Sequence, residues 1–138
     1  EVERLYPPVG GGFRSVVEDY EFNGYHVPQG WQALYQILRT HKDSRVYTEP
    51  ERFDPDRFSA ERAEHKKQEF SLVGFGGGPR ICLGIAFAQM EMKIFAAQLL
   101  RDYDWELLPN QNITLDLLPT LHPRSGLQVK FWKRLSDT

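Results

Sequence analysis

The sequence predicts a mixed α+β fold in which helices are accompanied by small β hairpins. Two patterns predict it. Between residues 83 and 100, apolar residues recur every three or four positions, which is the spacing of one face of a helix. Beyond that segment, apolar and polar residues alternate at residues 103–107 and again at residues 127–131, which is the period of a half-buried strand.

The chain begins with a segment that is typical of the end of a helix. Residues 1–6 are followed by Pro7-Pro8, which stops a helix because proline has no backbone N–H to donate. Residues 14–26 predict a β hairpin, since the dipeptide Asn23-Gly24 suits its two-residue turn and apolar residues flank that turn.

Residues 31–39 are expected to form a short helix, and residues 40–74 a long irregular segment that is rich in proline and charge. A loop of that length is unusual in a compact domain unless it has a function. After the helix at residues 83–100, a third and weaker strand is indicated by Ile113, Leu115 and Leu117.

Cys82 is the single cysteine, and it lies in a glycine-rich segment, residues 75–84, whose sequence is Phe-Gly-Gly-Gly-Pro-Arg-Ile-Cys-Leu-Gly. The glycines allow a tight turn with positive φ angles. The helix that starts next places a partial positive charge near the sulfur. This arrangement suits a thiolate that is presented to an iron atom, and haem iron accepts such a thiolate as its axial ligand.

Other uses of a glycine-rich loop fail on spacing. The dinucleotide-binding pattern G-x-G-x-x-G would need glycine at Ile81 or at Pro79, and the P-loop lysine is missing. A zinc site needs several Cys or His ligands at short spacing, whereas the chain has one cysteine and four scattered histidines. An inert cysteine that packs in a core remains the alternative to a ligand.

Glu1 and Arg4 are three residues apart, so on a helix they share a face and can form an ion pair. A second arginine from a distant segment could hold the same carboxylate and would fix a loop more firmly than one contact does. A solvated surface pair, which contributes about 0–1 kcal/mol, is the alternative explanation for these charges.

Three segments resemble motifs of the cytochrome P450 monooxygenases, and they occur in that family's order. Residues 1–4 match E-x-x-R, and residues 50–58 match P-x-x-F-x-P-E/D-R-F. The fixed positions of the haem-binding loop F-x-x-G-x-R-x-C-x-G are matched by Phe75, Gly78, Arg80, Cys82 and Gly84. The resemblance extends over nearly the whole chain.

By this resemblance, the fold is mainly α and corresponds to the C-terminal third of the cytochrome P450 fold. Its parts would be the end of the E-x-x-R helix, a β hairpin, a short helix, an ordered meander, the cysteine loop, a long proximal helix and C-terminal β strands. Residues 1–138 would be the C-terminal haem-binding part of a single domain, with the distal oxygen-activating helix and any membrane anchor encoded upstream. Alone, the chain is expected to be inactive.

The resemblance also implies roles for individual residues. Cys82 would be the axial thiolate of haem b, and Phe75 would shield its sulfur from water. Arg80 and Arg14 would bind the haem propionates, because a guanidinium fork suits a carboxylate. The glycines that would shape the loop against the cofactor are Gly76, Gly78 and Gly84. The substrate pocket would be lined by Val9, Gly12, Phe13, Pro119 and Thr120. For all of these except Cys82, plain packing or surface charge remains an alternative.

The second arginine of the ion-pair network is, by the same resemblance, Arg57. Arg52 stands in a similar Pro-Glu-Arg-Phe string but occupies a variable position of the motif. Glu1, Arg4 and Arg57 would therefore hold the haem loop in place without taking part in the chemistry.

Further segments are similar to the branch of the family that hydroxylates retinoic acid, which has animal and cyanobacterial members. They are residues 7–14 (Pro-Pro-Val-Gly-Gly-Gly-Phe-Arg), Gly30-Trp31, Thr40-His41 and residues 104–108 (Asp-Trp-Glu-Leu-Leu). The expected function is insertion of one oxygen atom of O2 into a small apolar substrate, retinoic acid or another isoprenoid, with electrons from a ferredoxin or a flavoprotein reductase. Sterols and fatty acids stay open, since apolar pockets discriminate weakly.

Two other functional classes are compatible with the sequence. One is a non-catalytic haem-binding remnant that keeps the cysteine loop without turnover. The other is a structural or interaction domain in which Cys82 packs as a core residue.

Charge and hydropathy argue against two kinds of partner. A net charge of −2 offers no basic surface for nucleic acid, and the charged run at residues 62–67 is expected to be a solvated face. No apolar run approaches the roughly 20 residues of a membrane helix. One free cysteine suits a reducing compartment, so a cytoplasmic, bacterial location is favoured.

Overall fold

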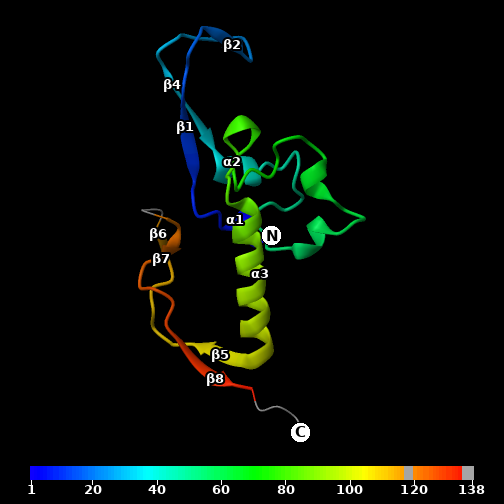
Figure 1. Ribbon diagram of the computed structural model, residues 1–138, viewed down its shortest axis with the longest axis vertical. Coiled ribbons are helices and arrows are strands. Elements are labelled where there is room, and N and C mark those ends of the chain that lie inside the picture. Colours follow the sequence, from blue (N-terminus) through cyan, green and yellow to red (C-terminus); the bar gives the residue numbers. More distant parts are fainter. Residues whose placement is uncertain (117–119, 135–138) are drawn as a thin grey trace. The chain divides into compact units, whose positions relative to one another are not determined.

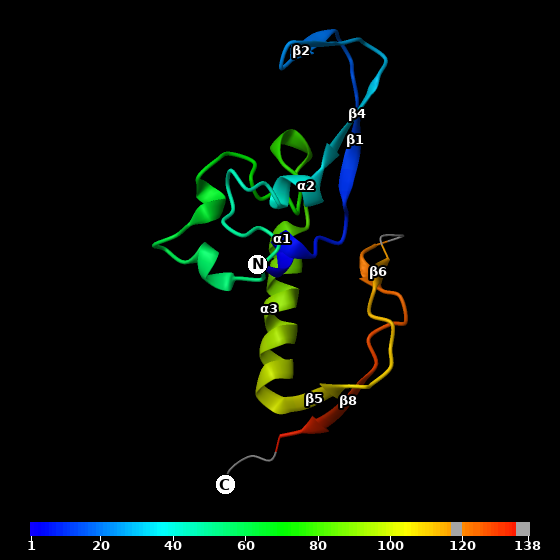
Figure 2. The same ribbon diagram turned by 180° about the vertical axis from the view of Figure 1, so that it is seen from behind.

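The computed structural model describes residues 1–116 and 120–134 of the chain. The chain divides into two compact units, Glu1–Gly74 and Phe75–Thr138, and each is described by itself. Figures 1 and 2 show their elements from opposite sides. The predicted α+β class is confirmed, because both units combine helix with short pairs of antiparallel strands.

The first unit contains two short helices and the pair of strands that joins them. Helix α1 (Val2–Leu5) ends before the two prolines, as predicted. Helix α2 (Ile37–His41) overlaps only the last three residues of the helix expected at residues 31–39 and ends two residues later. The preceding residues form strand β4 (Gln32–Gln36), so the prediction is wrong there. The reason is pairing with a distant strand, β1 (Gly11–Ser15), whose backbone hydrogen bonds override the local helical preference.

The hairpin predicted at residues 14–26 is correct only in its second part. Strands β2 (Tyr20–Phe22) and β3 (Tyr25–Val27) pair around Asn23-Gly24, whose φ angles of +50° and +80° suit a tight two-residue turn. Arg14 lies instead in β1, opposite Ala33 of β4. The sequence pattern could not distinguish these partners, because the exposed strands β2 and β3 carry no burial signal.

The interior of the first unit is small and unusually polar. Its buried apolar residues are Leu5, Pro7, Val16, Ile37, Val46 and Tyr47. Its buried polar residues are Arg4, His41, Arg57, Glu64 and Ser71. Two short 3-10 helices, η1 (Pro55–Phe58) and η2 (Glu64–Lys66), carry two of them, so the long segment before the cysteine loop is ordered although largely irregular.

The second unit is organised around one long helix. Helix α3 (Ile85–Asp102) confirms the predicted helix but begins and ends two residues later than residues 83–100. Strand β5 (Tyr103–Leu107) follows directly and pairs antiparallel with β8 (Val129–Lys133). Both alternating segments are therefore strands, although Leu127 lies just before β8.

A second, shorter pair of strands completes this unit. Strand β6 (Leu115–Asp116) pairs antiparallel with β7 (His122–Pro123). Of the weaker predicted strand, Leu115 is confirmed, Ile113 lies before β6, and Leu117 lies outside the described residues. Across the described parts of both units, no helix has the length and hydropathy needed to cross a membrane.

Candidate functional site

The turn that carries Cys82 is closed by its own backbone. The Cys82 N–H donates a hydrogen bond to the Phe75 carbonyl oxygen at 2.8 Å, and the Ile81 N–H donates to the Gly78 carbonyl oxygen at 3.1 Å. Gly76 and Gly78 have φ angles of +79° and +63°. A residue with a Cβ pays about 1–2 kcal/mol for such angles, so the glycines permit the turn that brings Phe75 beside Cys82.

The sulfur is accessible at the start of helix α3. Cys82 is exposed and forms no disulfide. Gly84 is the N-cap of the helix, and a Cβ at this position would lie 3.9 Å from the Cys82 Sγ. A larger side chain would extend along the sulfur, so glycine keeps the approach to it open. Arg80, at the end of η3 (Gly78–Arg80), is exposed two residues before the cysteine.

Haem iron needs only one ligand from the protein on a given face of the porphyrin, and one accessible thiol can provide it. The porphyrin already supplies four nitrogen ligands, so the protein needs to add a single axial ligand on each face at most. A structural metal ion without a porphyrin needs three or four protein ligands. Within residues 1–116 and 120–134, no three His, Cys, Asp or Glu side chains gather in a way that could hold such an ion. Cys82 therefore fits haem and does not fit a metal ion bound by protein ligands alone.

The structure brings Glu1, Arg4 and Arg57 together in the interior of the first unit. Two nitrogens of the Arg4 guanidinium, Nε and Nη2, contact the two Glu1 carboxylate oxygens at 2.8 Å each. Arg57 Nε reaches Glu1 Oε1 at 3.1 Å, and the Asp54 N–H donates to the same oxygen at 3.0 Å. Burial by itself would raise the pKa of Glu1, but the hydrogen bonds from Arg4, Asp54 and Arg57 keep it below its ordinary value.

Arg52 takes no part in this network through its side chain. Its guanidinium is 66% exposed and pairs with Glu49 at 3.2 Å. Its backbone carbonyl does belong to the site, since it accepts hydrogen bonds from Arg4 at 3.3 Å and from Arg57 at 3.1 Å. The motif position therefore separated the two arginines as the structure does.

Glu64 is a member of the network that sequence analysis missed. The run at residues 62–67 was expected to be a solvated face, but the Glu64 side chain is 4% exposed and lies 2.7 Å from Arg57 Nη1. Arg62 and the Thr48 N–H also donate to its carboxylate, at 2.8 Å and 3.1 Å. Burial would raise the pKa of Glu64, yet these three donors together lower it to about 2. No local pattern marks this residue, because its partners lie 2, 7 and 16 positions away.

The Arg14 side chain is exposed and lies against Tyr35. It lies in β1, and its guanidinium stacks on the Tyr35 ring at 4.9 Å from the ring centre. Its Nη1 donates to the Phe13 carbonyl oxygen at 2.8 Å. The side chain is exposed beside a hollow that Val16 and Tyr20 help to line. The propionate role of Arg14 stays a prediction.

The predicted substrate-pocket residues of the first unit lie in and just before β1. Val9 and Phe13 are exposed, at 50% and 64%. Gly12 has a structural reason of its own, because a Cβ there would come within 2.6–2.9 Å of the Tyr35 ring and hydroxyl. In the second unit Thr120 is exposed, and Pro119 lies outside the described residues. The pocket assignment stays a prediction.

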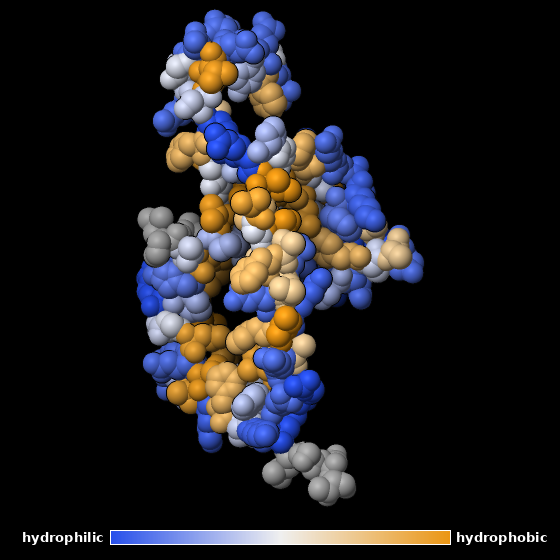
Figure 3. All heavy atoms as spheres, in the orientation of Figure 1, coloured by the Kyte–Doolittle hydropathy of each residue, from blue (hydrophilic) through white to orange (hydrophobic). Residues whose placement is uncertain are grey.

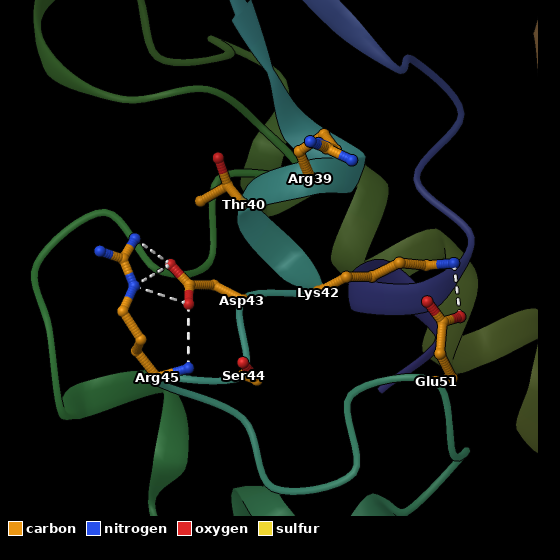
Figure 4. Close-up of a pocket in the computed structure, with 7 residues that line it drawn as sticks. All are labelled: Arg39, Thr40, Lys42, Asp43, Ser44, Arg45 and Glu51. Atoms are coloured by element: carbon orange, nitrogen blue, oxygen red, sulfur yellow. Dashed lines mark hydrogen bonds and ion pairs between the residues drawn. The ribbon is translucent and has the colours of Figure 1, made fainter.

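A polar pocket of the first unit has a different character, and Figure 4 shows its lining. Lys42 pairs with Glu51 at 2.6 Å, and Arg45 pairs with Asp43. Its cations are thus largely neutralised by acidic neighbours. It includes none of the residues predicted for cofactor or substrate, and its polar lining does not suit an apolar ligand.

Comparison with known proteins identifies the family of the chain. A family model described as Cytochrome P450 matches residues 1–131. The putative cytochrome P450 120 of Synechocystis sp. is 49% identical over 130 residues, which cover 94% of this chain and 29% of that protein. Cytochrome P450 26B1 of Homo sapiens is 41% identical over 132 residues, 96% of this chain and 26% of that protein.

A solved structure, retinoic acid-bound cyanobacterial CYP120A1, is similar with a TM-score of 0.92 and 47% sequence identity. The match covers 96% of this chain and 31% of that one. The chain thus spans less than a third of the length of these relatives.

Proposed function

This chain belongs to the cytochrome P450 family, and from that premise we propose that it provides the proximal, thiolate side of the haem site of a monooxygenase. The observation that carries the proposal is the exposed, unpaired Cys82, held in a glycine turn at the start of α3. The chain covers only part of its relatives' length, so the activity proposed belongs to the full-length protein that contains it.

Each loop residue has a task towards haem b in this proposal. Cys82 would provide the thiolate ligand, and Phe75, whose carbonyl oxygen accepts from the Cys82 N–H, would limit the access of water to the sulfur when haem is bound. Gly76, Gly78 and Gly84 let the backbone approach the cofactor closely. Arg80 and Arg14 bind the propionates as guanidinium–carboxylate pairs.

Bound haem would supply the oxygen chemistry: one atom of O2 would enter the substrate and the other would leave as water, with two electrons from a redox partner and two protons from solvent. The thiolate favours this chemistry by donating electron density to the iron. We propose a ferredoxin or a flavoprotein reductase as that partner. The Glu1–Arg4–Arg57 network does not touch the cofactor in this scheme and acts by holding the first unit in shape.

We propose retinoic acid, or another isoprenoid of similar shape, as the substrate. Two observations support it: the likeness to the retinoic acid-bound cyanobacterial structure, and the apolar, exposed side chains of Val9 and Phe13 at the predicted pocket edge. The test is a spectral titration of the full-length haem protein with retinoic acid, a fatty acid and a sterol. Binding of the fatty acid or the sterol alone would contradict this substrate class.

The ligand assignment is tested by two replacements at one position in the full-length protein. Cys82→Ser removes the thiolate, so the ferrous carbonyl complex should lose its thiolate spectrum and substrate oxidation should cease. Cys82→His keeps an iron ligand of another kind, and should retain haem while showing a changed spectrum and no turnover. A Cys82→Ser protein with an unchanged spectrum and normal activity would overturn the proposal.

The same spectrum separates the remaining alternatives. The exposed Cys82 contradicts its packing as a core residue, and a structural or interaction domain would take up no haem at all. A non-catalytic remnant would show the thiolate spectrum without oxidising any substrate in the presence of a reductase.

A further inference from the structure

The chain that leads into the cysteine turn is held at two points. The Val73 N–H donates a hydrogen bond to His41 Nε2 at 2.8 Å. The Tyr47 hydroxyl donates to the Ser71 carbonyl oxygen at 3.1 Å. Val73 is separated by one residue from Phe75, whose carbonyl closes the turn at Cys82. Residues 71–73 are therefore the last part of the chain that the first unit fixes before the cysteine turn begins.

His41 is committed to this contact by both ring nitrogens. Because a backbone N–H can only donate, Nε2 must be the unprotonated acceptor of the Val73 hydrogen. Nδ1 must then carry the ring hydrogen, which it donates to the Arg4 carbonyl oxygen at 2.9 Å. The residue is completely buried. Burial lowers the pKa of His41, as does the nearby Arg4 guanidinium, and both effects preserve this neutral form.

The two anchoring residues are themselves held by the arginines of the ion network. Arg4 Nη1 donates to the His41 carbonyl oxygen at 2.7 Å, so Arg4 and His41 bind each other's backbones. The Tyr47 ring lies 4.9 Å from the Arg4 guanidinium and 6.0 Å from that of Arg57. A continuous series of contacts thus joins Glu1 to the two arginines, the arginines to His41 and Tyr47, and these two residues to the backbone of residues 71–73.

We propose that His41 is a positioning residue for the cysteine turn: it anchors Val73 to helix α1 and to the buried ion network, and Tyr47 provides a second anchor at Ser71. The inference rests on the proposed function, because a firmly held turn keeps the Cys82 sulfur in the position that an iron ligand needs. The alternative is that His41 merely fills space in the core. Space alone does not need two directed bonds to backbone groups, whereas an anchor does.

Two substitutions separate these readings, because each keeps a different nitrogen's role. In His41→Gln the terminal amide reaches the place of Nε2 and its oxygen can still accept from Val73. In His41→Asn the shorter amide takes the place of Nδ1 and can donate to Arg4, but nothing accepts from Val73. Both variants disturb the same buried site, so a general loss of packing should affect them alike.

The first readout is hydrogen–deuterium exchange of the peptide that contains Val73, in the full-length protein without added substrate. We expect the Val73 amide to exchange about tenfold faster in His41→Asn than in His41→Gln. Equal exchange in the two variants would overturn the anchor, whether or not the protein binds haem.

The second readout is the fraction of ferrous carbonyl complex that shows the thiolate spectrum. It should fall in His41→Asn, stay near the unsubstituted value in His41→Gln, and fall slightly in Tyr47→Phe, which keeps the ring but removes the bond to Ser71. If the unsubstituted protein lacks the thiolate spectrum, the proposed function fails while the exchange measurement still decides the anchor. If that spectrum is present and both His41 variants keep it fully, the positioning role fails alone.

Discussion

The two units of the chain differ in what their interiors contain. The first, Glu1–Gly74, buries a cluster of charged and aromatic side chains. Arg4, His41, Tyr47 and Arg57 in this cluster are all 0% exposed. The second, Phe75–Thr138, carries the candidate ligand Cys82 but has no buried residue among those described. Its helix α3 exposes large apolar side chains, and Figure 3 shows hydrophobic residues at the surface along α3, β5 and β8.

The difference indicates two sources of order. In the first unit, hydrogen bonds and ion pairs join residues more than 30 positions apart, so its polar interior specifies one arrangement of α1, α2 and the irregular segment. In the second unit, the backbone bonds lie mainly within α3 and between the exposed strands β5 and β8, and no described side chain is buried to add to them. A helix gains most of its stability from packing of its apolar face, so α3 depends on surfaces that cover it. The first unit is thus ordered by its buried polar contacts, whereas the exposed apolar side chains of the second unit need other surfaces to pack against.

The largest expected effect concerns the 138-residue chain on its own. With the exposed residues Phe87, Ile94 and Phe95 along α3, we expect it to bind a hydrophobic dye strongly and to aggregate or remain molten. Haem and a reductase should yield no oxidised substrate. The measurements are dye fluorescence, sedimentation and product assay. A monomer that unfolds cooperatively and turns over substrate would remove the contrast between the units.

Arg57→Ala should be the most damaging single change in the polar unit. It leaves Glu1 with one of its two arginines and removes the closest partner of buried Glu64, and breaking such a buried pair costs about 3–5 kcal/mol. Arg52→Ala is the matched control, because it removes an exposed guanidinium and should cost about 0–1 kcal/mol. Thermal unfolding and haem content of the full-length protein are measured for both. Equal losses would mean that the network does not stabilise the protein.

These contacts also mark the boundary of what the sequence could reveal. The pairing of Glu1 with Arg4 follows from helical spacing, and helix α3 follows from its period, since both are local. Glu64 and His41 gave no local signal, because the Arg57 partner of Glu64 lies 7 positions away in an irregular segment without a fixed period, and the Val73 partner of His41 lies 32 positions away. Strand β4 was mistaken for helix for the same reason: its partner β1 begins 21 residues earlier, where Gly11 leaves no β propensity to read.

Glu64→Gln tests the missed member of the network, with a smaller effect that depends on pH. The folded-state pKa of Glu64 is lowered to about 2 from an ordinary value of 4.5. The carboxylate therefore stabilises the fold fully above pH 4.5, and this contribution is lost as the pH falls towards 2. At pH 7 the variant should be about 1.5–3 kcal/mol less stable, as for hydrogen bonds to charged groups.

The pH dependence identifies the cause of that loss. Unfolding of both proteins is followed at pH 7 and at steps down to the lowest pH at which the fold persists. The difference between Glu64→Gln and the unsubstituted protein should shrink below pH 4.5. A difference that is constant with pH would attribute the loss to shape rather than to charge.

The smallest expected effect is that of alanine at two glycines, both of which have a positive φ angle. Gly24 in the β2–β3 turn has a φ of +80°, Gly78 in the cysteine turn has +63°, and an added Cβ would meet no atom within 4 Å at either place. Alanine should therefore cost about 1–2 kcal/mol at each site through φ strain alone.

The consequences of the two substitutions for the thiolate spectrum should differ. Gly24→Ala should loosen an exposed hairpin and leave the thiolate spectrum unchanged, whereas Gly78→Ala should alter that spectrum because the Gly78 carbonyl accepts from Ile81 beside Cys82. The spectrum and the unfolding temperature of both variants are measured in the full-length protein, with Gly24→Asn as a control that tolerates positive φ. A thiolate spectrum that is equally unaffected by both alanines would show that the cysteine turn is held by its surroundings and not by its own backbone.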